Sequence, residues 1–114
     1  MLVEDDESLR DAMLIELQSV GLRVMTAANG EEALALARGG PRPSVIVLDL
    51  NMPVMDGWQF RAKQLLDPRL ADIPVIVLTA RGDADRQARS LGVAAALSKP
   101  VDLDRLHEAL AAHC

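Results

Sequence analysis

The chain has 114 residues, of which 50% are hydrophobic and 25% are charged, a balance typical of one globular domain with its own core. The formal net charge of −5 gives no basic surface for nucleic acid, and no apolar run approaches the roughly 20 residues that a membrane helix needs. The lone cysteine, Cys114, cannot form an internal disulfide, so we expect a reducing compartment and hence the cytoplasm.

Short apolar runs alternate with longer amphipathic stretches along the chain. The apolar runs have the length of strands and show no polar alternation, which indicates strands that are buried on both faces. In chain order they are Met1–Val3, Leu22–Met25, Val45–Leu48, Val75–Leu78 and, more weakly, Val93–Leu97.

The amphipathic stretches predict five helices. The first carries an apolar stripe at helical spacing and stops at Gly21, and the second begins after the cap Asn29. The stripe consists of Leu9, Met13, Leu17 and Val20. The other three helices run from about Met55 to Leu66, from Ala84 to Leu91, and onward from the cap residue Asp102. Strand and helix thus alternate five times, which predicts an α/β fold: a doubly wound parallel sheet with helices on both faces.

Polar residues follow the predicted strands at the edge where such a sheet carries its chemistry. They are Glu4, Asp5 and Asp6 after the first strand, Asp49 and Asn51 after the third, Thr79 after the fourth, and Ser98 and Lys99 after the fifth. We therefore expect carboxylates, a hydroxyl and an ammonium group to share one cleft.

The chemistry of such a cluster is restricted. Two carboxylates about 4 Å apart repel each other by roughly 4 kcal/mol at an effective dielectric of about 20, so the cluster needs a cation or a shared proton. Hard oxygen ligands with room for water suit Mg²⁺. A carboxylate beside Mg²⁺, with an ammonium and a hydroxyl nearby, favours phosphoryl transfer, in which the carboxylate can itself be the nucleophile.

Four segments resemble the signature segments of response-regulator receiver domains, the chemotaxis-regulator-like domains of two-component signalling. They are Val3-Glu4-Asp5-Asp6, Leu48-Asp49-Leu50-Asn51-Met52-Pro53-Val54-Met55-Asp56-Gly57, Leu78-Thr79-Ala80 and Ser98-Lys99-Pro100. They occur in the family's order and cover essentially the whole chain. The resemblance implies a flavodoxin-like three-layer sandwich with five helices and the strand order 2-1-3-4-5, in which residues 1–114 form one receiver domain without an output domain.

The resemblance also implies a role for each site residue. Asp49 would accept the phosphoryl group, while Thr79 and Lys99 would contact its oxygens. The Mg²⁺ ligands would be Glu4 (through water), Asp5, Asp49 and the backbone carbonyl of Asn51. The Lys99–Pro100 peptide would be cis. The side chains of Asn51 and Arg81 would tune self-dephosphorylation.

The same resemblance implies the partners. The phosphoryl donor would be a sensor histidine kinase or a histidine phosphotransfer protein, docked near the first helix, where Leu14 and Ile15 fall outside the apolar stripe; burial by neighbouring elements is the alternative for these two. The domain would signal through a downstream protein, without contacting nucleic acid or membrane. It would not be an enzyme, because it would catalyse only its own phosphorylation and dephosphorylation.

The sequence departs from the family at Ala96, among other places, and two alternative functions remain to be weighed. Ala96 stands where receivers usually carry an aromatic switch residue, so we expect a small phosphorylation-driven change near it. Haloacid-dehalogenase-like phosphohydrolases also use an aspartate nucleophile after a strand, but they carry a second aspartate two positions later, where this chain has Asn51. A pseudo-receiver that only binds partners is disfavoured by the complete acidic set together with Thr79 and Lys99.

Overall fold

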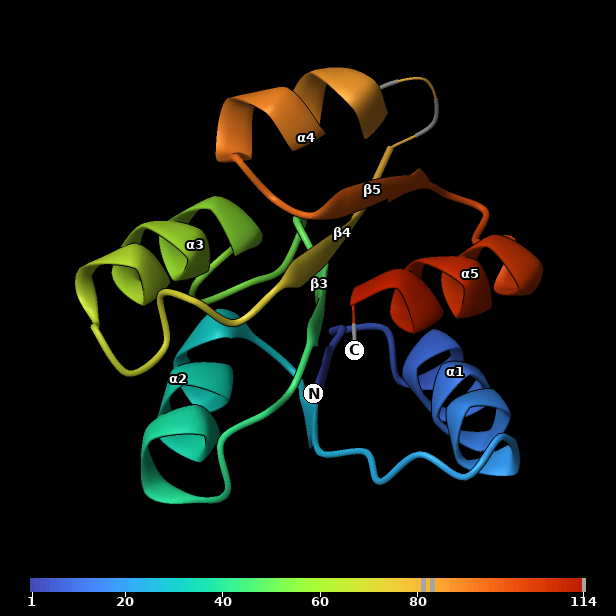
Figure 1. The fold of residues 1–114 in the computed structure, drawn as a ribbon, viewed down its shortest axis with the longest axis horizontal. Helices are drawn as coiled ribbons and strands as arrows, with labels where there is room; N and C mark the ends of the chain where they lie inside the picture. The colour runs from blue at the N-terminus through green and yellow to red at the C-terminus, as the bar shows by residue number, and fades with distance from the viewer. Residues whose placement is uncertain (81, 83, 114) are drawn as a thin grey trace.

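The computed structural model describes residues 1–80, 82 and 84–113. A single parallel sheet of five strands lies at its centre, in the order β2-β1-β3-β4-β5 (Figure 1). The strands are β1 (Leu2–Val3), β2 (Thr26–Ala27), β3 (Ile46–Asp49), β4 (Val75–Thr79) and β5 (Ala95–Ser98). The predicted doubly wound sheet and its strand order are confirmed.

The helices cover both faces of the sheet and complete three layers. They are α1 (Glu7–Ser19), α2 (Gly30–Gly39), α3 (Gly57–Leu66), α4 (Ala84–Leu91) and α5 (Leu103–His113). Helices α1 and α5 lie together on one face, and α2 and α3 lie together on the other (Figure 1). Helix α4 packs against β4 and β5. None of the helices in the described part of the chain is long and apolar enough to cross a membrane.

Alternate residues of the strands pack into two separate hydrophobic cores, one on each face of the sheet. In β3, Ile46 and Leu48 belong to the cluster that α2 and α3 cover, whereas Val47 belongs to the cluster that α1 and α5 cover. Because side chains alternate across a strand, a strand covered by helices on both faces must be apolar at every position. This requirement explains why the strands appear in the sequence as unbroken apolar runs.

The second strand does not lie where the sequence predicted it. The apolar run Leu22–Met25 lies outside the sheet, and β2 is Thr26–Ala27 instead. Leu2, the first residue of β1, stands opposite Thr26, and its backbone N–H donates to the carbonyl of Met25, so the apolar run meets β1 only through its last residue and the strand pairing begins at Thr26. The stripe of the first helix is also shorter than predicted, since α1 ends at Ser19 and Val20 is exposed.

Aspartate and asparagine caps set the starts of three helices. The side chain of Asp6 accepts a hydrogen bond from the Leu9 backbone N–H, and Asn29 caps α2 in the same way. Asp56 forms a capping box with Gln59, so α3 begins at Gly57 rather than at the predicted Met55. A Cβ atom on Gly57 would lie 2.7 Å from the Cα of Leu50. Glycine at this position therefore lets α3 start directly against the residue that follows Asp49.

Candidate functional site

The three predicted carboxylates meet at the carboxyl edge of the sheet. Strand β1 pairs directly with β3, with Val3 opposite Leu48, so Glu4 and Asp49 are neighbours at the ends of these strands. The side chains of Glu4 and Asp49 are buried, whereas Asp5 is exposed. One carboxylate oxygen from each of the three lies within 4.8 Å of the others, an arrangement that could hold a metal ion.

Lys99, the residue after β5, reaches into this cluster. Its Nζ lies 3.2 Å from Oδ1 of Asp49 and 3.4 Å from Oε1 of Glu4. Its backbone N–H donates to the carbonyl of Thr79, and its peptide bond to Pro100 is cis, as the resemblance implies. One ammonium group thus bridges two carboxylates that come from two other strands.

In the part of the chain that the structure describes, the three carboxyl groups of the cluster outnumber the one ammonium group that contacts them. Oε2 of Glu4 is buried there without a hydrogen-bond partner. Burial, followed by hydrogen bonding to Asp49 and the charge of Asp49, raises the pKa of Glu4 to about 8, although Lys99 acts in the opposite direction. Burial disfavours the charged form of Lys99, but Asp49 and then Glu4 outweigh this effect and raise its pKa. An added cation would satisfy both the unpartnered oxygen and the excess negative charge.

Thr79 and Asn51, the two remaining residues predicted for the site, both lie close to Asp49. Thr79 is the buried last residue of β4, the strand between those that end in Asp49 and Ser98. The backbone N–H of Asn51 donates to Oδ1 of Asp49 at 3.3 Å, while its side chain is exposed. The structure therefore gathers every predicted site residue except Arg81, which lies outside the described residues.

Arg10 is a contact of the site that the sequence did not suggest. Its Nη1 donates to the backbone carbonyl of Glu4 at 3.0 Å and so ties α1 to the acidic segment that follows β1. The only signal in the sequence is its place on the first turns of α1, where an exposed arginine is the ordinary interpretation. Arg10 thus holds the backbone of the acidic segment rather than its carboxylates.

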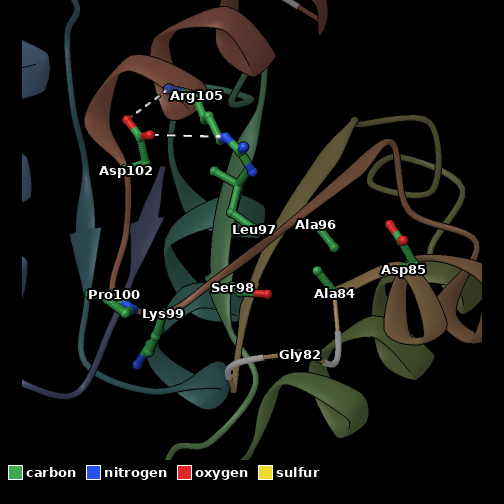
Figure 2. A pocket seen from close by; sticks show the side chains of 10 residues that line it. All are labelled: Gly82, Ala84, Asp85, Ala96, Leu97, Ser98, Lys99, Pro100, Asp102 and Arg105. Atoms are coloured by element: carbon green, nitrogen blue, oxygen red, sulfur yellow. Dashed lines mark hydrogen bonds and ion pairs between the residues drawn. The ribbon is translucent and has the colours of Figure 1, made fainter.

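A hollow of about 550 Å³ borders the site between β5, α4 and α5 (Figure 2). Small side chains, those of Ala84, Ala96 and Ser98, line its central part, with Lys99 toward the acidic cluster. Ala96 stands opposite Val77 of β4 and presents only a methyl group to this space. The absence of a large side chain at residue 96 therefore coincides with an open volume next to the site.

Comparison with known proteins places this geometry in a family. The family model for the response regulator receiver domain matches residues 1–111. The transcriptional regulatory protein AfsQ1 of Streptomyces coelicolor is 42% identical over 83 residues, which are 73% of this chain and 35% of that protein. The response regulator Rre1 of Synechocystis sp. is 38% identical over 93% of this chain and 47% of its own length. The chain thus spans between about a third and a half of these two relatives.

Solved structures agree. The chemotaxis response regulator CheY4 of Vibrio cholerae superposes with a TM-score of 0.88 at 32% identity, covering 99% of this chain and 95% of that chain. A response regulator receiver protein from Pseudomonas putida gives a TM-score of 0.87 at 28% identity, covering 97% and 93%. Fold, site geometry and family model agree, and the chain belongs to the receiver domains of two-component response regulators.

Proposed function

We propose that this receiver domain accepts a phosphoryl group on the carboxylate of Asp49. The observation that carries the proposal is the pairing of a buried aspartate with Lys99 at 3.2 Å, inside a cluster that holds two further carboxylates. Receiver domains of response regulators interact with histidine kinases and downstream effectors. The donor proposed here is the phosphohistidine of a sensor histidine kinase or of a histidine phosphotransfer protein.

The transfer exchanges one bond to phosphorus for another. An oxygen of Asp49 attacks the phosphorus, the bond from phosphorus to the histidine nitrogen breaks, and that nitrogen keeps the electron pair and takes up a proton. Lys99 and the backbone N–H of Asn51 both contact Oδ1 of Asp49 and orient its carboxylate. We assign to Lys99 and the Thr79 hydroxyl the stabilisation of negative charge on the phosphoryl oxygens.

Mg²⁺ is the cofactor that we propose for the acidic cluster. Glu4, Asp5, Asp49 and the backbone carbonyl of Asn51 would hold it, and the unpartnered Oε2 of Glu4 supports this assignment. When bound, Mg²⁺ supplies positive charge against the transferring phosphoryl group. The residues of the chain orient the nucleophile, and Arg10 fixes the backbone of the acidic segment.

We propose that residues 1–114 act as one receiver domain in the cytoplasm and that another protein or domain reads its phosphorylation. The domain would be a stoichiometric acceptor rather than a turnover enzyme, because the product phosphate is attached to the chain itself. Helix α1 is the proposed docking site of the donor. Its residue Ile15 is 68% exposed, so burial by neighbouring elements does not explain why an apolar residue stands at this position.

Chemical trapping tests the assignment to Asp49. The protein is incubated with Mg²⁺ and phosphoramidate, whose phosphorus–nitrogen bond resembles that of phosphohistidine. It is then reduced with borohydride, which converts an aspartyl phosphate into homoserine. Peptide mass spectrometry should find homoserine at residue 49 in the wild type and in the control variant Asp72→Asn, an exposed acid remote from the cluster. Homoserine at another aspartate, with residue 49 unmodified, would contradict the proposal.

A further inference from the structure

An apolar groove with a basic rim runs along α3, on the side of the molecule away from the hollow next to Ala96. Its apolar part has a volume of about 350 Å³ and is lined by Val54, Met55, Gln59, Ala62, Lys63 and Leu66. A second hollow shares Lys63 and Leu66 with it, and a third continues from Arg38 to Arg42 and Arg69. We call these three adjoining hollows the α3 groove.

The groove displays the most exposed apolar side chains of the described residues. Leu66 is 83% exposed and Val54 is 74% exposed, more than any other large hydrophobic residue in that part of the chain. Both line the same hollow, Val54 from the loop after β3 and Leu66 from the last turn of α3. Single exposed apolar residues are ordinary, but two that share one depression indicate a contact surface.

The backbone of Val54 points to the same conclusion. Its φ is 68°, in the left-handed region that β-branched residues rarely adopt. Glycine or asparagine would occupy this conformation with less strain. Because the side chain of Val54 is largely exposed, its packing within the domain contributes little stabilisation to offset the backbone strain. A strained apolar residue displayed to solvent is a frequent mark of a functional surface.

The rim of the groove is positively charged, although the whole chain has a net charge of −5. Four cationic side chains line the three hollows: Arg38, Arg42, Lys63 and Arg69. The one acidic side chain that lines them, Asp67, lies 3.1 Å from Arg38 and 3.7 Å from Arg69. Helix dipoles explain why cations lie in the last turns of α2 and α3, where Arg38 and Lys63 stand. They do not explain Arg42 and Arg69, which lie in the adjoining loops.

We propose that the α3 groove docks an acidic segment of a separate protein partner. Aliphatic side chains of that segment would lie between Val54 and Leu66, and its carboxylates would face Lys63 and the three arginines. Protein is favoured over nucleic acid because the most exposed lining residues, Val54 and Leu66, are aliphatic and suit the apolar side chains of a protein segment. This inference does not depend on phosphorylation of Asp49.

A designed peptide tests the groove without knowledge of the natural partner. The probe is an amphipathic helical peptide of about 15 residues, long enough to lie along α3, with leucine on one face and glutamate on the other. Backbone NMR of the full chain should show the largest shift changes at Val54, Ala62, Lys63 and Leu66. Two matched peptides, one with lysine for glutamate and one with serine for leucine, should bind much more weakly.

Variants separate this role from a structural one. Leu66→Gln should weaken binding of the acidic peptide about tenfold, the effect of losing one anchor side chain, and should leave phosphorylation of Asp49 unchanged. Val54→Gly should weaken binding while raising the unfolding midpoint, because it relieves strain. Equal binding of the lysine peptide, tighter binding of a single-stranded oligonucleotide, or shift changes confined to another face would each overturn the proposal.

Discussion

The Lys99 ammonium lies 3.2 Å from the Asp49 carboxylate, although a whole strand separates the two residues in the sheet. Asp49 ends β3, Lys99 follows β5, and β4 lies between them. Neighbouring strands are about 4.8 Å apart, so only a long side chain can cross this gap. Thr79, the last residue of β4, therefore lies between Asp49, the proposed nucleophile, and the backbone of Lys99.

Magnesium should stabilise the folded protein through the acidic cluster. A cation that binds only the folded state adds about 2.7 kcal/mol to the free energy of unfolding when its concentration is about 100 times its Kd. Thermal melts with and without Mg²⁺ measure this effect. Asp5→Ala should abolish most of the Mg²⁺-dependent shift, whereas Asp11→Ala on α1 should retain it. An equal shift in Asp5→Ala and the wild type would count against the proposed ligand set.

Phosphorylation should change the surface around α4 and β5 only slightly. Ala96 presents a methyl group to the hollow in Figure 2, so no large side chain at this position can move between two packed states. Backbone NMR with beryllofluoride, which mimics a phosphoryl group, should show small shifts in Ala84–Leu91 and Ala95–Ser98 relative to those beside Asp49. Ala96→Phe should enlarge them. Large shifts in the wild type would show that the missing ring does not matter.

The buried Arg61 should be a major source of stability outside the site. Its guanidinium group donates to the carbonyls of Leu91 and Gly92 and to Oε1 of Gln64, and thereby joins α3 to the end of α4. Arg61→Ala would leave Oε1 of the buried Gln64 and the part-buried carbonyl of Leu91 without this donor, and should lower the free energy of unfolding by about 3 kcal/mol. Urea denaturation measures the loss. Arg105→Ala, which removes a 76% exposed side chain, should change stability by less than about 0.5 kcal/mol.

Asp67 should make stability depend on pH in the acid range. The backbone N–H of Arg69, followed by the side chain of Arg38, holds the pKa of Asp67 below its ordinary value of 3.8. A carboxyl group with a depressed folded-state pKa contributes stability above its unfolded pKa and loses it as pH falls through the folded value.

The variant Asp67→Asn isolates that contribution. It should melt below the wild type at neutral pH, and the difference should shrink once the pH falls below 3.8. Asp72→Asn serves as the control, since this exposed carboxylate lies in the same loop region. A difference in melting temperature that stays constant from neutral pH to pH 3 would indicate a cause other than this ionisation.

The sequence predicted which residues meet at one edge of the sheet better than it predicted the bounds of the elements that carry them. Glu4, Asp49, Thr79 and Lys99 follow apolar runs, and parallel topology brings the ends of such strands to one edge. The position of β2 could not be predicted in the same way. Leu22–Met25 is the more apolar run, but the register with Leu2 selects Thr26–Ala27.

The interior network of α3 was also beyond prediction. Arg61 and Gln64 are polar residues on an amphipathic helix, and such residues ordinarily face solvent. Here Gln64 is fully buried and donates to the carbonyls of Leu70 and Ile73. The two backbone carbonyls that accept from Arg61 lie 30 and 31 residues away in sequence, so no local pattern could reveal them.

Intact-protein mass spectrometry tests the central claim most directly. The wild type is incubated with acetyl phosphate and Mg²⁺, with parallel samples that contain a chelator in place of Mg²⁺ or the variant Asp49→Asn. The account predicts one added phosphoryl group in the wild type with Mg²⁺ and none in the other two samples. An unmodified wild type, or an Asp49→Asn variant labelled at the wild-type rate, would contradict it.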